Sequence, residues 1–346
     1  MNKESKIKFA VVGCGHIGKR HAAIIKAHQD CVLVALCDSE PKETLDIEDF
    51  DVPFFQNIDA LLSSGIDFDV VNIATPNGLH EAQSLKCLEA DKHIVIEKPM
   101  ALTKAGCERI IFKALQKQKQ VFCVMQNRYS PPSVWLKNLL ETKQLGRIFM
   151  VQINCYWNRD DRYYKPNVET GKPTGWHGTK DLDGGTLFTQ FSHFIDLMYW
   201  CFGDITNIKA RLSDFNHKNT TDFEDSGFVS FDFIDSGIGS LNYSTAVWDK
   251  NLESSITVIA ENGSVKIGGQ YMNIVEYCHI KDYTMPQLSA ANPPNDYGAY
   301  KGSAANHHYI IENIVDVLRG RKAITTNALE GMKVVEIIER IYSNRL

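Results

Sequence analysis

Apolar positions recur with two different periods along the chain, and the change of period separates two halves. In the first half, short apolar runs alternate with stretches of helical spacing, which predicts buried strands joined by helices. The predicted strands cover residues 7–12, 32–37, 70–74, 93–96 and 121–125. The predicted helices cover residues 20–27, 58–62, 80–90 and 104–119. This order indicates a parallel, doubly wound sheet.

Beyond Pro131, apolar and polar residues alternate with a period of two, which is typical of antiparallel strands exposed on one face. Strands are predicted at residues 148–157, 205–212, 226–234, 237–245, 254–261 and 264–268. The sequence Glu261-Asn262-Gly263-Ser264 predicts a hairpin turn between the last two. Helices are predicted at residues 133–142, 186–201, 306–320 and 329–344, and a long loop at 158–183.

The fold class that follows is α/β with two domains. Residues 1–126 are predicted to form the doubly wound α/β domain, and residues 127–346 an α+β domain with an open, mostly antiparallel sheet. A length of 346 residues suits this division.

Composition excludes several classes of function. The net charge is −5, from 37 basic and 42 acidic residues without a long basic run, so we expect no nucleic-acid partner. An N-terminus without an apolar signal core and the absence of any long apolar run predict no membrane partner. The 9 cysteines form no CxxC pair, which indicates reduced thiols and a cytoplasmic protein.

The first predicted strand runs into the turn Gly13-Cys14-Gly15-His16-Ile17-Gly18. In such a turn the first glycine permits the tight bend, the second lets the backbone approach a pyrophosphate, and the third lets the helix pack on the sheet. Asp38 follows the second strand, where a carboxylate accepts hydrogen bonds from ribose hydroxyls and repels a 2′-phosphate. We therefore predict that residues 1–126 are a Rossmann dinucleotide-binding domain, which binds NAD rather than NADP through Gly13, Gly15, His16, Ile17, Gly18 and Asp38.

Polar residues also follow the later strands of this half, at the sheet edge where ligands of doubly wound folds bind. These further candidate cofactor residues are Thr75, Pro76, Asn77, His80, Glu97, Lys98 and Gln126. A plain proline-containing turn is the alternative for residues 75–77, and a solvated charge is the alternative for Lys98.

In the second half, His193 is a candidate general base because the ordinary pKa of histidine lies near neutral pH. Its predicted helix places Thr189 and Asp196 on the same face, and Gln190 lies beside them as a candidate substrate residue. A buried core histidine is the alternative. Asp196 has two open roles, orienting His193 or a structural hydrogen bond.

Several motifs, taken in this order and spacing, resemble the Gfo/Idh/MocA oxidoreductase family over essentially the whole chain. They are the glycine turn, Ala74-Thr75-Pro76-Asn77, Glu97-Lys98-Pro99, and Gly184-Gly185 with His193 and Asp196. A softer similarity, to bacterial UDP-N-acetyl-2-amino-2-deoxy-D-glucuronate 3-dehydrogenases, is carried by Gln126-Asn127-Arg128, Tyr156-Trp157-Asn158-Arg159, Tyr163-Tyr164, Trp176-His177-Gly178-Thr179 and residues 251–256 and 261–265.

The resemblance implies an NAD-dependent oxidoreductase that acts on a CH–OH group, with Lys98 and His193 as catalytic residues. It implies oxidation of the C3 hydroxyl of a UDP-sugar acid for diamino-sugar and lipopolysaccharide O-antigen synthesis, with an aminotransferase as the next enzyme. It also implies that the domain of residues 127–346 serves substrate binding and oligomerisation, and that the protein is a homo-oligomer, a tetramer or dimer. The residues that would bind the anionic UDP-sugar are Lys98, Arg128, Arg159, Tyr163, Tyr164, Gln190 and His193, with Lys165 beside them.

Thr189 departs from the family pattern, which commonly has Asp at this position. The departure removes one carboxylate from the expected catalytic set and argues against inositol-type chemistry. Two alternatives stay open: an NAD-dependent dehydrogenase of a free sugar or polyol, and a non-catalytic nucleotide-sensing regulator. No metal site is predicted, because the neighbouring His307 and His308 point apart on a helix.

Overall fold

The computed structural model describes residues 5–164, 175–235, 237–298 and 301–346. Its contacts divide the chain into two compact units, Met1–Met125 with His307–Val335, and Gln126–Asn306 with Glu336–Leu346. The first junction lies beside the predicted boundary. Segment 307–335, predicted to belong to the second domain, instead packs with the first. Its helix α8 (His307–Leu318) contacts α1 (His16–Ala27), and an amphipathic pattern cannot reveal which domain supplies its partner.

The first unit contains a parallel sheet of 6 strands in the order β3-β2-β1-β4-β5-β6. This is the doubly wound order whose reversal between β1 and β4 creates a ligand crevice. The strands are β1 (Ile7–Val12), β2 (Cys31–Cys37), β3 (Phe54–Phe55), β4 (Val70–Ile73), β5 (His93–Ile96) and β6 (Val121–Cys123). All but the two-residue β3 were predicted, because both faces of the inner strands are apolar.

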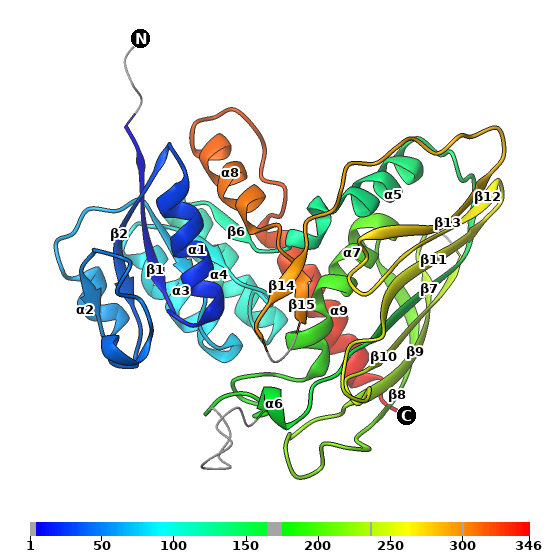
Figure 1. Cartoon of the computed structure of the whole chain (residues 1–346), viewed down its shortest axis with the longest axis horizontal. Coiled ribbons are helices and arrows are strands. Elements are labelled where there is room, and N and C mark those ends of the chain that lie inside the picture. Colours follow the sequence, from blue (N-terminus) through cyan, green and yellow to red (C-terminus); the bar gives the residue numbers. More distant parts are fainter. Residues whose placement is uncertain (1–4, 165–174, 236, 299–300) are drawn as a thin grey trace. The chain divides into compact units, whose positions relative to one another are not determined.

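Helices flank this sheet (Figure 1). Besides α1 they are α2 (Ile58–Leu62), α3 (His80–Glu89), α4 (Lys104–Lys117), α8 and the first part of α9 (Ala328–Ser343). Short 3₁₀ turns lie at Lys42–Thr44 and Asn77–Leu79. Helix α4 begins where the Thr103 side chain accepts a hydrogen bond from the Gly106 amide, which satisfies one unpaired donor of the first turn.

The second unit contains a sheet of 7 strands in the order β13-β12-β11-β7-β10-β9-β8. The pairing of β7 with β10 is parallel and the other pairings are antiparallel, as predicted for a mostly antiparallel sheet. The strands are β7 (Ile148–Tyr156), β8 (Ile205–Ser213), β9 (Ser226–Phe233), β10 (Ile238–Ser244), β11 (Glu253–Ala260), β12 (Gly263–Gly268) and β13 (Ile274–Ile280). A separate small sheet pairs β14 (Pro294–Asp296) with β15 (Lys301–Ala304).

Helices α5 (Pro131–Glu141) and α7 (Ser192–Phe202) lie on one side of the larger sheet (Figure 1), and α6 (Asp161–Tyr164) is short. A 3₁₀ turn, Gln126–Tyr129, precedes α5. The register aligns Ile259, Met150 and Ile238 in one row across the sheet. Ile259 and Ile238 are 43% and 52% exposed, so this face carries apolar side chains that the described residues leave in contact with solvent.

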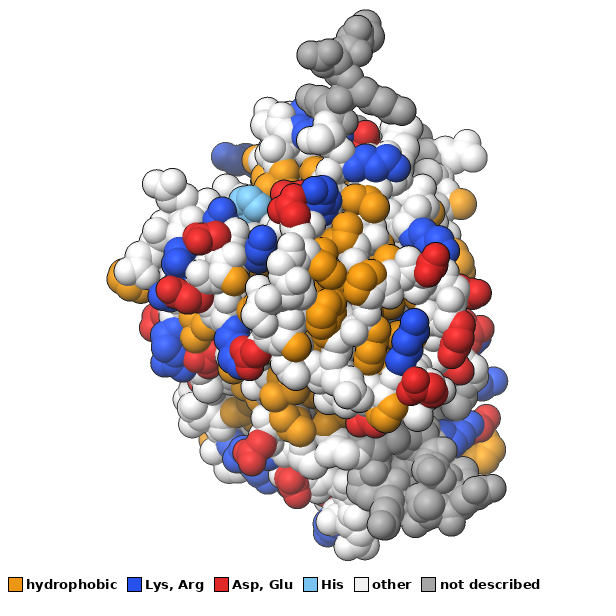
Figure 2. All heavy atoms as spheres, turned by 90° about the vertical axis from the view of Figure 1, so that its left-hand side faces the viewer, with side chains coloured by type: hydrophobic (Ala, Val, Ile, Leu, Met, Phe, Trp, Pro, Cys, Tyr) orange, Lys and Arg blue, Asp and Glu red, His pale blue; other side chains and the backbone are white. Residues whose placement is uncertain are grey.

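The face on the side of α2 and β2 carries interspersed basic and acidic side chains around an apolar strip, with no field of one sign (Figure 2). Among the described residues, none of the helices combines the length and the apolar character needed to cross a membrane.

A buried carboxyl group anchors the start of the helix that carries His193. Glu224 accepts hydrogen bonds from the hydroxyls of Tyr243 and Tyr342, both at 2.8 Å, and the Tyr342 hydroxyl in turn accepts the amide of Leu187. A Cβ at Gly185 would lie 2.4 Å from the same hydroxyl, which explains a glycine there. Burial raises the pKa of Glu224 to about 7, although both tyrosine hydrogen bonds oppose the shift.

Because this pKa is raised in the folded protein, stability is lost as the pH rises from about 5 to 8. Glu224→Gln keeps an acceptor for both tyrosines and removes the charge, so the variant should gain up to about 3 kcal/mol relative to wild type over this range. Urea unfolding as a function of pH measures the difference. The exposed Glu312→Gln serves as the control, and parallel pH profiles of wild type and Glu224→Gln would contradict the expectation.

Candidate active site

The glycine turn has the form that a pyrophosphate cradle requires. Gly13 has φ +91°, and a Cβ there would lie 2.5 Å from the Ala74 carbonyl oxygen. A Cβ at Gly18 would lie 1.7 Å from the Gly13 carbonyl oxygen, so only glycine lets α1 start this close to β1. Around Gly15 a Cβ would meet nothing within 4 Å, which leaves open space for a ligand at the N-terminus of α1. The three glycines therefore fit a dinucleotide.

Asp38 lies at the carboxyl end of β2 beside this turn. Its Oδ2 accepts the Cys14 amide at 2.6 Å, and its Oδ1 accepts the Glu40 amide at 3.0 Å. Two backbone donors thus hold the half-buried carboxylate against the glycine turn. Each carboxylate oxygen has a further lone pair for a ribose hydroxyl.

His80 joins two loops at the same sheet edge. One ring nitrogen, Nδ1, lies 2.7 Å from the Pro99 carbonyl oxygen, and the other, Nε2, lies 2.9 Å from that of Thr75. Burial lowers the pKa of this histidine. The ring therefore positions the segment around Thr75 relative to Lys98-Pro99, and a direct contact of His80 with the cofactor stays a prediction.

Lys98 is half-buried just after β5, and its backbone amide lies 3.2 Å from the Oε2 of Glu97. Glu97 itself is 7% exposed. Its other oxygen contacts His21 of α1, a residue that the sequence reasoning did not single out. A histidine three positions after Gly18, on the same helix, was the available signal.

In the second unit, the helix that carries His193 does not begin as an ordinary α-helix. Residues Leu187–Phe191 form a π-helical turn, and α7 follows. The predicted helix over 186–201 is therefore present, but the wider turn alters the spacing on which the shared face of Thr189 and His193 was inferred. Such π-helical turns are frequent at functional sites.

His193 is 2% exposed, and its Nε2 lies 3.2 Å from the amide nitrogen of Gln126. If the amide donates, Nε2 is the acceptor and a neutral ring carries its proton on Nδ1. Gln126 was predicted to bind the cofactor. In the structure it lies in the second unit and contacts the candidate base.

The Thr189 hydroxyl, which stands where the family commonly has Asp, donates to Asp183. Its partners are the Asp183 carbonyl oxygen at 2.9 Å and the Asp183 carboxylate. The Gly178 amide also donates to this carboxylate, at 2.7 Å. A buried acid six positions upstream therefore lies next to the unusual residue, which the sequence pattern did not reveal.

Arg128 and Asp196 form a buried, two-pronged ion pair. The guanidinium donates from Nε to Oδ2 at 2.8 Å and from Nη2 to Oδ1 at 2.6 Å, and both side chains are 1% exposed. Asp196 thus has a structural partner, one of its two expected roles. The paired hydrogen bonds engage much of the Arg128 guanidinium, so its role in substrate binding stays a prediction.

Arg159 contacts Gln190, and both are candidate substrate residues. Its Nε donates to the Oε1 of Gln190 at 2.7 Å, and the guanidinium lies over the rings of Trp157 and Tyr163. The rings of Tyr163 and Tyr164 meet edge to face at 4.9 Å. Arg159, Gln190 and both tyrosines are buried, and Lys165 lies outside the described residues.

Comparisons with known proteins match two parts of the chain to one family. Residues 7–125 match the Gfo/Idh/MocA oxidoreductase family with its NAD-binding Rossmann fold, and residues 134–266 match the Gfo/Idh/MocA C-terminal domain. An uncharacterized oxidoreductase of Synechocystis is 24% identical over 291 residues, which are 81% of this chain and 76% of that protein.

Two solved structures are also similar. The WlbA dehydrogenase of Chromobacterium violaceum, in complex with NADH and UDP-GlcNAcA, is 29% identical with a TM-score of 0.86 over 99% of this chain and 94% of its own. WlbA of Bordetella pertussis, with the same ligands, is 28% identical with a TM-score of 0.85 over 98% and 96%.

The two family matches cover most of the chain, and the glycine turn with Asp38 has the geometry that the first of them requires. The protein therefore belongs to the Gfo/Idh/MocA family and is an NAD-dependent oxidoreductase acting on a CH–OH group.

Proposed function

We propose that the protein oxidises the C3 hydroxyl of UDP-N-acetyl-2-amino-2-deoxy-D-glucuronate to the 3-keto sugar. The observation that carries the proposal is the match over 99% of the chain to a dehydrogenase crystallised with NADH and UDP-GlcNAcA. The buried Arg159–Gln190 pair beside Tyr163 supports it, because arginine and tyrosine suit an anionic nucleotide sugar.

In the proposed reaction, His193 accepts the proton of the C3 hydroxyl. With the exchangeable amide of Gln126 turned over, its Oε1 would accept the Nε2–H of His193, hold the imidazole in place and leave the Nδ1 lone pair of the neutral ring to take the proton. Lys98 donates to the same oxygen and stabilises it as ketone character develops. NAD, when bound, supplies the hydride acceptor at nicotinamide C4.

Thr189 weakens an alternative, the oxidation of a free polyol such as inositol. The resembled polyol enzymes commonly use a carboxylate at this position, whereas here the hydroxyl of Thr189 donates to Asp183. We propose that Asp183 holds Thr189 in place, and that His193 and Lys98 carry the proton chemistry.

The pathway and assembly are proposals of the same kind. A 3-keto UDP-sugar acid is a substrate for an aminotransferase, which would lead to a diamino sugar for lipopolysaccharide in the cytoplasm. The partly apolar open face of the second unit, with Ile238 and Ile259, supports a homo-oligomer, a tetramer or dimer, because covering such a face removes apolar surface from water.

The substrate is tested with purified protein and NAD, by following NADH absorbance with a panel of sugars. The proposed substrate, UDP-N-acetyl-2-amino-2-deoxy-D-glucuronate, should give the highest kcat/KM. UDP-N-acetylglucosamine should be a poor substrate because it lacks the carboxylate, and inositol and glucose should be inactive. Because a tightly held NADH can mask turnover, the 3-keto product is also sought by mass spectrometry, with and without 2-oxoglutarate. Activity with inositol or glucose but not with the UDP-sugar acid would refute the proposal.

The catalytic roles are tested with His193→Asn and Lys98→Met. Loss of the base should lower kcat by about 100- to 10,000-fold while NAD still binds, because proton transfer typically contributes that much. Removing the Lys98 ammonium should have a comparable effect through the reacting oxygen. The exposed His279→Asn is the matched control and should keep wild-type kcat. Wild-type turnover in His193→Asn would exclude this histidine as the base.

Cofactor choice is tested at Asp38. Asp38→Ala should weaken NAD binding by roughly 10- to 100-fold, the usual cost of losing hydrogen bonds to a charged acceptor. Asp38→Asn keeps a hydrogen-bonding side chain but removes the repulsion of a 2′-phosphate, so NADP should gain relative to NAD. Glu40→Ala, the same charge change two residues away, should alter neither ratio. Unchanged NAD/NADP selectivity in both Asp38 variants would contradict the assignment.

A further inference from the structure

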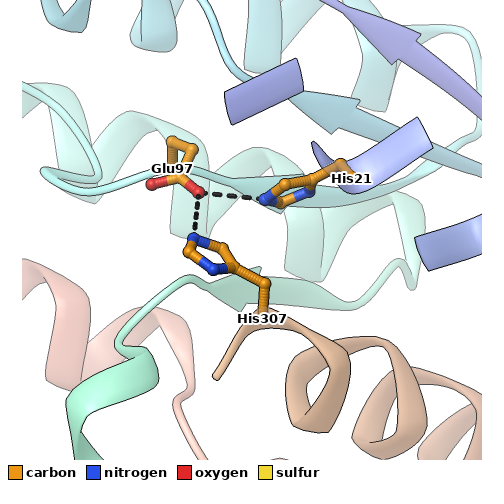
Figure 3. Close-up of side chains that lie close together, drawn as sticks. All are labelled: His21, Glu97 and His307. Atoms are coloured by element: carbon orange, nitrogen blue, oxygen red, sulfur yellow. Dashed lines mark hydrogen bonds and ion pairs between the residues drawn. The ribbon is translucent and has the colours of Figure 1, made fainter. Parts of the chain in front are cut away.

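Three side chains that lie far apart in the sequence meet inside the first unit (Figure 3). His21 comes from α1, Glu97 follows β5, and His307 begins α8. The Nε2 atoms of both histidines face one carboxylate oxygen, Glu97 Oε1, at 3.0 Å for His21 and 3.6 Å for His307. All three residues are buried, and their ligand atoms lie within 4.8 Å of one another.

His307 has no hydrogen-bonding partner among the described residues at either ring nitrogen, although it is 1% exposed. The distance from His307 Nε2 to Glu97 Oε1 is longer than a hydrogen bond, so this contact leaves Nε2 without a hydrogen-bonding partner. Buried polar atoms in folded proteins almost always have a hydrogen-bonding partner or a ligand, which can be a water molecule or an ion. The imidazole points its Nε2 at the carboxylate and thus into the cluster (Figure 3).

Asn72 lies where it can orient His21 as a metal ligand. Its side-chain amide lies 2.7 Å from the Nδ1 of His21, and its Oδ1, as placed, has no partner among the described residues. The nitrogen and oxygen of an amide are exchangeable assignments. Turned over, Oδ1 accepts the Nδ1–H of His21 and leaves the Nε2 lone pair directed at the cluster, which is how outer-shell acceptors orient a ligating histidine.

We propose that His21, Glu97 and His307 bind a divalent transition-metal ion, with Zn²⁺ as the expected one. Two imidazoles and one carboxylate form a donor set that zinc proteins use, whereas Mg²⁺ and Ca²⁺ prefer oxygen ligands. Ligand-to-ligand separations of 3.0 and 3.6 Å match the edges of a tetrahedron with metal bonds of about 2.0–2.1 Å.

The ion would have a structural effect close to the candidate catalytic lysine. It would join the start of α8 and the middle of α1 to the residue after β5. The same carboxylate receives the Lys98 amide on its second oxygen. The inference is independent of the proposed sugar substrate, because the three ligands and their test involve neither the sugar nor NAD.

The test begins with protein stripped of metal by a chelator and dialysed, without sugar or NAD. Titration with Zn²⁺ should reach one equivalent per chain, measured by equilibrium dialysis and metal analysis, and should raise the melting temperature. Co²⁺, used as a spectroscopic probe, should give the intense visible absorption of a four-coordinate site, and Zn²⁺ should displace it.

Variants assign the site to these residues. His307→Ala should lose the bound equivalent of Zn²⁺ and the Co²⁺ spectrum. The neighbouring His308, whose ring packs at a tilt against Tyr309, serves as the control, and His308→Ala should keep both. Asn72→Ala should weaken Zn²⁺ binding by about 10- to 100-fold, as expected for an outer-shell partner. Circular dichroism checks that each variant is folded.

Two results would overturn the proposal. One is a folded wild-type protein that binds no stoichiometric Zn²⁺ or Co²⁺. The cluster would then be held by the His21–Glu97 hydrogen bond without a metal ion. The other is Zn²⁺ binding of equal affinity in wild type and His307→Ala, which would place the ion elsewhere. If His307→Ala does not fold, the wild-type titration and His21→Asn decide the question by the same criteria.

Discussion

The first unit depends on the close approach of a helix to the turn before it. A Cβ at position 18 would collide with the Gly13 carbonyl oxygen, so α1 can start where it does only because both positions are glycine. This approach places the open end of α1 at the glycine turn. It also sets His21, one turn further along the helix, against Glu97 at the end of β5. The ligand cradle and the buried cluster therefore share one steric condition.

In the second unit, a buried histidine and its polar neighbours lie on a largely apolar helix, so their polar groups need partners. The π-helical turn before α7 is tied down by the Tyr342 hydroxyl, and that hydroxyl is held by Glu224. Arg128 and Asp196 neutralise each other within the same region, since an unpaired charge buried this deeply would be costly. The result is a helix start and a buried ion pair whose polar groups are paired with one another on the elements around His193.

The contacts of Thr189 give a physical reason for a threonine where the family commonly has Asp. A carboxylate at this position would lie beside that of Asp183, and two buried carboxylates in contact repel each other. A threonine instead donates its hydroxyl to Asp183. The chain thus keeps an acid in the region but supplies it from the segment before the helix.

The sequence by itself determined the strands of the first unit except the two-residue β3, the glycine turn with Asp38 and the family. Each of these follows from short-range rules: buried parallel strands are continuously apolar, and a pyrophosphate turn needs glycines at fixed spacing. Most strands of the second unit were also predictable from their two-residue alternation, whereas β13, with polar residues on both faces, was not.

Tertiary structure decided the features that join distant positions. The packing of α8 with the first unit, the contact of Gln126 with His193, and the π-helical turn depend on partners that no local pattern specifies. The clearest case is His307. In the sequence, next to His308, it has the pattern of an ordinary helix residue. Only the fold, which buries it opposite Glu97 and His21 from elements more than 200 positions away, makes it a candidate metal ligand.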